Sequence, residues 1–410
     1  MTPKSAKARH GALIRSISHN NSPPVKRINA FQLAFQQPAR RFESMNRTEF
    51  DYDACLRNGA TRLISLKFLE SCANRDALGM EMLYTYLDAG LYECPNDFFS
   101  QALSRVNSND LHTAIACRLV ICDYLIRSDK WHETKALLDS IPQSFHGFEF
   151  NLRSLSFLRE KFGRVPIASH KLDRLVGRAS ITSLLWYGRF GHTLAEYLKL
   201  QYICDELKIS LEVPEHWIGR EIFLLDNPLI DRTRPRYARS MHSVDSAADL
   251  EKSIEGYDIF SPGGWNWKSI TSGQREFARG KLRIRDCINN ILQIFFADLL
   301  KRDFLSVHIR LTDVAEPDFY LSRIKDIRST FGDSLIYLAS DDLDRAKDLC
   351  AGMNILTAEN FSDSTLPPWL IDFYALTVST MAAVPSSSSF SNVALLINPR
   401  ISPRDVLFFE

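Results

Sequence analysis

An apolar run that ends abruptly in charged residues is the feature that most constrains this chain. Residues 304–309, FLSVHI, are rich in aromatic and β-branched side chains, which predicts a buried β-strand. His308, Arg310 and Asp313 lie at or just after its carboxyl end. Ligands bind at that edge of an open α/β sheet, and a guanidinium offers paired donors that suit phosphate oxygens. These residues alone leave two interpretations open: a phosphate site, or a strand-end ion pair beside a core histidine.

Strands and helices alternate from this point to the C-terminus. One long helix over residues 274–299 leads into the first strand, and polar groups follow two later strand ends, Asp341 with Asp342 and the serine run 386–391. The alternation predicts a parallel, doubly wound sheet, in which such strand ends gather at one crevice. The serine run alone is more typical of an ordinary helix cap. The predicted helices are 317–331, 343–350, 368–380 and 392–397, and the predicted strands are 334–340, 353–356 and 382–384.

A second strand–helix–strand unit precedes the first one. Residues 183–214, SLLWYGRFGHTLAEYLKLQYICDELKISLEVP, indicate a strand, a turn that holds Gly188 and Gly191, a helix over 194–207 and a strand over 209–213. The turn does not match G-x-G-x-x-G, which disfavours a dinucleotide site. The loop-rich stretch that follows carries Trp265 and Trp267 beside a Gly-Gly pair. It is either a sugar-facing loop or a linker with aromatic anchors.

The N-terminal third has a different pattern. Residues 46–170 place apolar side chains at spacings of three and four, which predicts a succession of helices that includes 60–73, 77–91, 111–127 and 131–141. They resemble tetratricopeptide units weakly, so a stacked-helix module for a protein partner and a helical cap on the next domain both remain open. Residues 1–45 are basic, with no acid before Glu43, and are predicted to be a disordered tail or a targeting segment.

Composition excludes several classes of protein. The formal net charge of +1 gives no support for a nucleic-acid partner, and no apolar run approaches the ~20 residues of a membrane span. The eight cysteines form no C-x-x-C pair, which argues against a zinc site and a disulfide framework. We therefore expect a cytoplasmic protein without a bound metal or cofactor.

Four motifs in the same order resemble those of the α1,2-, α1,6- and protein O-fucosyltransferases. VHIRLTD, LIYLASDD and SSSSFSNVALL are similar to H-x-R-R-(G/T)-D, (A/F)-(S/T)-D-D and S-S-x-F-S. GRFGHTLAEYLKL resembles G-R-x-G-N-x-L-x-Q-Y, with His192 and Glu196 in place of the asparagine and glutamine. The resemblance covers residues 181–410. Leu311 stands where many members have a second arginine.

This resemblance implies a GT-B-like fold, with two Rossmann-type domains over residues 178–270 and 271–410. The second domain would bind GDP-fucose, and the sugar would be transferred with inversion and without a metal to a glycan or a protein. Three sets of residues follow. The donor site would comprise His308, Arg310, Asp341, Asp342, Ser388, Ser389, Phe390 and Ser391, with Gly188 and Gly191 on the facing wall. The acceptor side would comprise His192, Trp265 and Trp267, and the catalytic candidates are Arg310, Asp313 and Glu316.

Three other functions stay open. Leu311 and His192 favour a catalytically silent, transferase-like scaffold that uses the helical region to bind a partner. The donor could instead be a different nucleotide sugar. Asp342-x-Asp344 also resembles the metal-binding D-x-D of another glycosyltransferase class, although Asp344 fits the first turn of a helix better.

Overall fold

The computed structural model describes the greater part of the chain beyond residue 97. The contacts divide the chain into two units, residues 1–51 and 52–410, and every described residue belongs to the second. The predicted tail over 1–45 therefore lies outside the described residues. These are 62–63, 92–93, 98–106, 111–127, 130–141, 148–165, 178–181, 190–213, 217–229, 238–240, 248, 259–261, 270–311, 317–331, 335–361 and 365–409.

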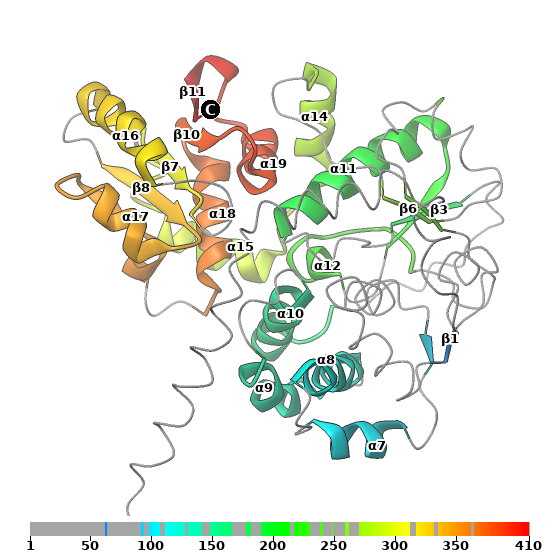
Figure 1. The fold of residues 1–410 in the computed structure, drawn as a ribbon. Coiled ribbons are helices and arrows are strands. Elements are labelled where there is room, and N and C mark those ends of the chain that lie inside the picture. Colours follow the sequence, from blue (N-terminus) through cyan, green and yellow to red (C-terminus); the bar gives the residue numbers. More distant parts are fainter. Residues whose placement is uncertain are drawn as a thin grey trace, which may run out of the picture. The chain divides into compact units, whose positions relative to one another are not determined.

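Within the described residues, five parallel strands of the C-terminal part form one sheet (Figure 1). Its spatial order is β9-β8-β7-β10-β11, so the first strand in sequence lies in the middle and the order reverses between β7 and β10. This confirms the predicted doubly wound sheet. The strands are β7 (Leu305–Ile309), β8 (Ile336–Ser340), β9 (Ile355–Leu356), β10 (Met381–Pro385) and β11 (Val406–Phe409), of which β11 was not predicted.

The two faces of β7 bury different partners. Leu305, Val307 and Ile309 pack in one apolar cluster with residues of α16 and α17. On the other face, the Ser306 hydroxyl donates to the Ala375 carbonyl oxygen of α18 (3.2 Å). All five residues of β7 are buried, as expected for a central parallel strand. The helices of this part are α16 (Pro317–Phe331), α17 (Leu343–Leu349), α18 (Pro368–Val378) and α19 (Ser389–Ile397), with 3-10 turns at η2 (Ala358–Phe361) and η3 (Pro403–Asp405).

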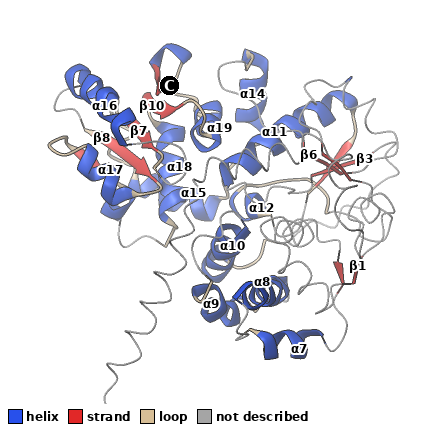
Figure 2. Cartoon of the chain, in the orientation of Figure 1, coloured by secondary structure: helices blue, strands red, loops and turns tan. Residues whose placement is uncertain are grey.

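A second parallel sheet lies in the described part of residues 178–261 (Figure 2). The predicted helix and the strand after it are confirmed with different bounds, because α11 begins at Phe190 and takes Gly191 into its first turn. The strand predicted before the turn lies outside the described residues, and a strand at Arg178–Ile181 precedes it. The order is β4-β3-β6-β5. The elements are β3 (Arg178–Ile181), α11 (Phe190–Leu207), β4 (Ser210–Glu212), α12 (Ile218–Ile222), β5 (Ala238–Ser240) and β6 (Ile259–Ser261).

The single long helix predicted over residues 274–299 is wrong. The structure has α14 (Ser272–Lys281) and α15 (Asp286–Phe295), separated by an extended segment. In that segment Ile284 forms an antiparallel bridge with Phe223, and the Arg283 carbonyl oxygen accepts from the Leu224 N–H (2.9 Å). Backbone pairing with a distant segment therefore outweighs local helix propensity here.

The described elements of the N-terminal region are helices apart from one pair of short strands. Within the helix predicted over 60–73, residues 62–63 instead form β1 (Arg62–Leu63), which pairs in parallel with β2 (Tyr92–Glu93), so ladder hydrogen bonds replace helical ones there. The rest of that predicted helix lies outside the described residues. The helix predicted over 77–91 lies outside the described residues. Successive helices then pack on one another. They are α7 (Phe98–Arg105), α8 (Leu111–Arg127), α9 (Trp131–Asp139) and α10 (Phe148–Phe162).

Helix α10 also packs on elements of both sheets. The Arg159 Nε donates to the Glu221 Oε1 of α12 (2.9 Å), and both side chains are buried. The Phe150 ring lies 5.5 Å from the Trp369 ring of α18. These contacts favour a helical cap, and the choice between a cap and a separate module stays a prediction.

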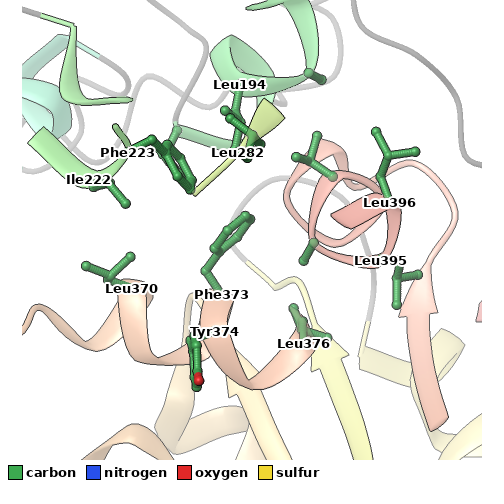
Figure 3. Close-up of a cluster of buried hydrophobic side chains, with 14 of the residues drawn as sticks. Leu194, Ile222, Phe223, Leu282, Leu370, Phe373, Tyr374, Leu376, Leu395 and Leu396 are labelled. Carbon is green, nitrogen blue, oxygen red and sulfur yellow. The ribbon is translucent and has the colours of Figure 1, made fainter. Parts of the chain in front are cut away.

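One hydrophobic cluster joins the helices of the two sheets. It contains residues of α11, α12, α14, α18 and α19. Figure 3 shows Phe373 of α18 pointing toward Phe223, and the Phe190 ring of α11 packs against both (centroids 5.0 and 6.1 Å). No helix in the described part of the chain is both long and apolar enough to cross a membrane.

Candidate functional site

Arg310 lies immediately after β7, and its backbone is held on both sides. The Tyr320 hydroxyl of α16 donates to the Arg310 carbonyl oxygen (2.9 Å) and lies 3.3 Å from the Arg310 amide nitrogen. The next amide, that of Leu311, donates to the Asp341 Oδ1 (2.8 Å) at the end of β8. Adjacent strand ends are therefore tied together, so the position from which the half-buried Arg310 extends is well defined.

Leu311 has a role in the core. Its side chain is buried and packs in the cluster that contains Val307, Ile309 and Tyr320. An arginine with the same backbone would place its guanidinium among these apolar groups, at a large desolvation cost. Among the described residues that follow β7, the positive charge therefore comes from Arg310.

Asp342 contributes to the local structure. Its carboxylate caps α17 by accepting from the Arg345 N–H (3.3 Å), and the Arg345 Nη1 lies 3.7 Å from the Asp342 Oδ2. Asp344 lies in the first turn of α17, as predicted. Asp341 and Asp342 are both half-buried at the carboxyl end of β8, where the resemblance predicted part of the donor site. That role stays a prediction.

The serine run forms the turn between β10 and α19. Ser388 is the N-cap of α19 and accepts from the Ser391 N–H (3.5 Å), and both side chains are fully buried. Asn392 donates to the Ser386 carbonyl oxygen (3.0 Å) and closes the turn. Ser388 and Ser391 thus support the turn from inside, whereas Ser389 and Phe390 are half-buried and reach the surface.

His308 is a buried residue of β7. Its Nδ1 forms a hydrogen bond with the Ser391 hydroxyl, and its ring lies 5.5 Å from the Phe390 ring. The ring is therefore buried and bonded to a hydroxyl of the serine run, and the donor contact of His308 stays a prediction. Through this bond the ends of β7 and α19 are held in one arrangement.

The first turns of α11 and α19 touch each other. A Cβ atom on Gly191 would lie 2.3 Å from the Phe390 Cα and 2.6 Å from its amide nitrogen. Only glycine allows this approach. The sequence predicted Gly191 on a wall that faces the serine run, and the structure brings the two together.

A series of polar side chains connects α11 to α19 at the same place. The His192 Nδ1 lies 3.4 Å from the Ser389 Oγ, and its Nε2 lies 3.6 Å from the Glu196 Oε1, one turn further along α11. Glu196 is buried, whereas the His192 side chain is 31% exposed. The sequence analysis singled out Glu196 only as a departure from a motif. Its spacing of four residues from His192 was the signal that could have identified the pair.

These elements form one candidate site at the edge where the sheet order reverses. β7 and β10 are neighbours, with Val307 opposite Ala383, so Arg310 and the serine turn follow adjacent strand ends. The N-termini of α19 and α11 add backbone N–H groups and the positive ends of two helix dipoles. The arrangement can bind an anion with several acceptor oxygens, and a diphosphate is such an anion.

Other predicted residues could not be placed. Gly188, Asp313, Glu316, Trp265 and Trp267 lie outside the described residues. Among the residues that are described, no group of three or more His, Cys, Asp or Glu side chains could hold a metal ion.

One buried carboxyl group beside the site was not predicted from the sequence. Asp372 of α18 accepts from the Tyr337 hydroxyl (2.8 Å) of β8, and burial raises the pKa of Asp372 to about 7. The Ser340 backbone also bonds to it, which links α18 to the strand end that carries Asp341. The signal that could have identified Asp372 was its place as the single acidic residue of the apolar helix PWLIDFYALTV.

Comparison with known proteins finds similarity in structure. No family sequence model and no curated protein sequence matches the chain. Among solved structures, POFUT1 in complex with GDP-fucose is 12% identical with a TM-score of 0.40, over 58% of this chain and 99% of that one. Fucosyltransferase NodZ from Bradyrhizobium is 16% identical with a TM-score of 0.38, over 55% of this chain and 95% of that one.

Proposed function

We propose that this protein is an inverting, metal-independent glycosyltransferase that uses a nucleotide sugar. One observation carries the proposal: Arg310 and the serine turn follow neighbouring strands at the reversal point of a doubly wound sheet, and the first turn of α11 lies against that turn. Ligands bind at such reversal points. The motif resemblance favours GDP-fucose as the donor and a glycan or a protein as the acceptor.

The site has the charges needed to stabilise a leaving diphosphate. In the transfer, the acceptor oxygen forms a bond to the anomeric carbon while the bond from that carbon to the diphosphate oxygen breaks. The electron pair leaves with the diphosphate, where the Arg310 guanidinium and the helix N–H groups stabilise the negative charge. Attack from the opposite face inverts the configuration, and the acceptor proton passes to a carboxylate, for which Asp313 and Glu316 remain the candidates.

Nucleotide binding and the Arg310→Ala variant test the proposal together. A thermal-shift screen with GDP, UDP and dTDP should raise the melting temperature with one of the three, because a ligand that binds only the folded state stabilises it. Arg310→Ala should keep the unliganded melting temperature and lower the transfer rate by about 10²–10³-fold. The matched control is Arg323→Ala on the exposed side of α16, where Arg323 lies 4.0 Å from Asp326. Full activity in Arg310→Ala would show that this assignment is wrong.

A transferase-like scaffold is the second candidate. Leu311 favours it, because this position gives the site an apolar core residue instead of a second cation. The scaffold would bind neither GDP nor GDP-fucose, so titration with both ligands separates the two candidates. Activity that persists in EDTA would exclude the metal-dependent alternative based on Asp342 and Asp344.

A further inference from the structure

The starting point is the buried carboxylate of Glu196. Its side chain is 2% exposed, and its Oε1 lies 3.6 Å from the His192 Nε2 on the preceding turn of α11. A carboxylate held away from water is costly unless a cation or several donors compensate it. A His192 ring that carries a proton on both nitrogens would supply such a cation at this distance.

The second ring nitrogen of His192 contacts the turn that would bind phosphate. The His192 Nδ1 lies 3.4 Å from the Ser389 Oγ, and Ser389 is the first residue of α19. Its fully buried neighbours Ser388 and Ser391 bond within the turn, whereas Ser389 reaches the surface. Two successive contacts therefore connect the buried carboxylate of Glu196, through His192, to Ser389 in the candidate site.

The direction of the hydrogen bond to Ser389 depends on the charge of His192. A neutral imidazole whose proton faces Glu196 has an acceptor at Nδ1, so the Ser389 O–H donates to the ring. A protonated imidazole donates from Nδ1, which leaves the Ser389 O–H able to donate elsewhere. Phosphate oxygens are acceptors, so only the second arrangement gives a diphosphate a donor at this position.

We propose that His192 and Glu196 act as positioning residues that set the donor direction of Ser389, so that a nucleoside diphosphate binds with uptake of a proton at His192. The inference rests on the proposed function. The inference adds a form of regulation to that function. The affinity for the donor decreases as the pH rises, and the transfer rate at limiting donor decreases with it. Uptake of one proton limits the decrease to about tenfold per pH unit.

The elements around His192 also carry other charged groups. His308 of β7 bonds to Ser391, and Arg310 follows the same strand. On α12, Arg220 donates to backbone carbonyl oxygens and Glu221 pairs with Arg159. On α14, Arg279 donates to the Asn398 carbonyl oxygen, and Lys281 pairs with Asp205. Arg275 is a further cation on α14, and Lys199 is one on α11.

Calorimetric titration of the full chain with GDP tests the inference. UDP or dTDP replaces GDP if the thermal-shift screen selects it. Titrations in two buffers with different ionisation enthalpies, at several values between about pH 6 and pH 8, give the number of protons taken up, because an ordinary histidine titrates in this range. The wild type should take up a measurable fraction of a proton, and its affinity should decrease as the pH rises. His192→Asn should take up none and bind with little pH dependence.

Further variants separate a positioning role from a merely structural one. Glu196→Gln removes the charge that favours protonation and should move the decrease in affinity to lower pH. Ser389→Ala should abolish the proton uptake while the fold is retained. The control is His112→Asn on α8, in the helical region, which should leave the uptake unchanged.

The outcomes are distinct for the inference and for the proposed function. Proton uptake in His192→Asn equal to that of the wild type, or binding by the wild type without uptake, would overturn the role of His192 and leave the proposed function intact. The absence of binding by the wild type to any of the three diphosphates at every pH would overturn both.

Discussion

The contact between Gly191 and Phe390 depends on the absence of a single side-chain carbon. Gly191 lies in the first turn of α11 and meets the backbone of α19 rather than a flexible side chain. Backbone atoms cannot move aside without shifting a helix. The glycine therefore sets the distance between the two helix N-termini, and with it the distance between His192 and Ser389.

Gly191→Ala should separate the two helices. The added methyl group would lie 2.3 Å from the Phe390 Cα, so we expect a loss of about 1–3 kcal/mol of unfolding free energy and weaker diphosphate binding. Urea denaturation and GDP titration measure the two effects. The matched control is Gly280→Ala in α14, where no atom lies within 4 Å of the added carbon and helix propensity predicts a gain of about 1 kcal/mol. Equal stability of Gly191→Ala and the wild type would contradict the close approach.

At the scale of elements, Asp372 links α18 to the end of β8. Its carboxyl group accepts from the Tyr337 hydroxyl, and the Ser340 backbone bonds to it as well. Burial raises the pKa of Asp372 from 3.8 to about 7 and raises the pKa of Tyr337 well above its ordinary value. Near neutral pH this carboxyl group is therefore close to its titration point in the folded chain.

Asp372 makes the stability of the fold dependent on pH. The unfolded chain releases this proton near 3.8, whereas the folded chain keeps it until about 7, so between these values the folded chain binds more protons. Stability therefore decreases as the pH rises through this window, by an amount on the order of a few kcal/mol. Asp372→Asn should remove this contribution, and chemical denaturation at pH 5 and at pH 8 measures it. Asp326→Asn on the exposed side of α16 is the control. If Asp372→Asn lost as much stability between pH 5 and pH 8 as the wild type does, the pH dependence would belong to another group.

The elements that sequence could predict are those whose pattern is set locally. The buried strand 304–309, the strand end at Asp341 and the helix after the serine run follow from composition and period, and the structure has them. The break between α14 and α15 was not predictable, because it depends on pairing between Ile284 and Phe223. The burial of Ser388 and the contact from His192 to Ser389 depend likewise on how distant segments pack.

At the scale of the molecule, the helical region and the two sheets belong to one contact unit over residues 52–410. Glu221 of α12 connects them: it bonds to Arg159 of α10, and its backbone carbonyl oxygen accepts from Arg285 at the start of α15 (3.0 Å). Arg159 also donates to the Ile126 carbonyl oxygen of α8 (3.0 Å). We therefore expect the helical region to unfold with the sheets rather than before them.

Arg159→Met tests this cooperativity. Removal of one partner of a buried ion pair leaves the Glu221 carboxylate without that partner, at a cost of about 3–5 kcal/mol, whereas an exposed pair contributes about 0–1 kcal/mol. Arg283→Met is the matched control, because Arg283 and Asp286 are both largely exposed. Differential scanning calorimetry of the full chain should show one main transition, shifted as a whole to lower temperature in Arg159→Met and nearly unchanged in Arg283→Met. Two separated transitions, of which only the earlier responds to Arg159→Met, would instead show that the helical region is an independent module.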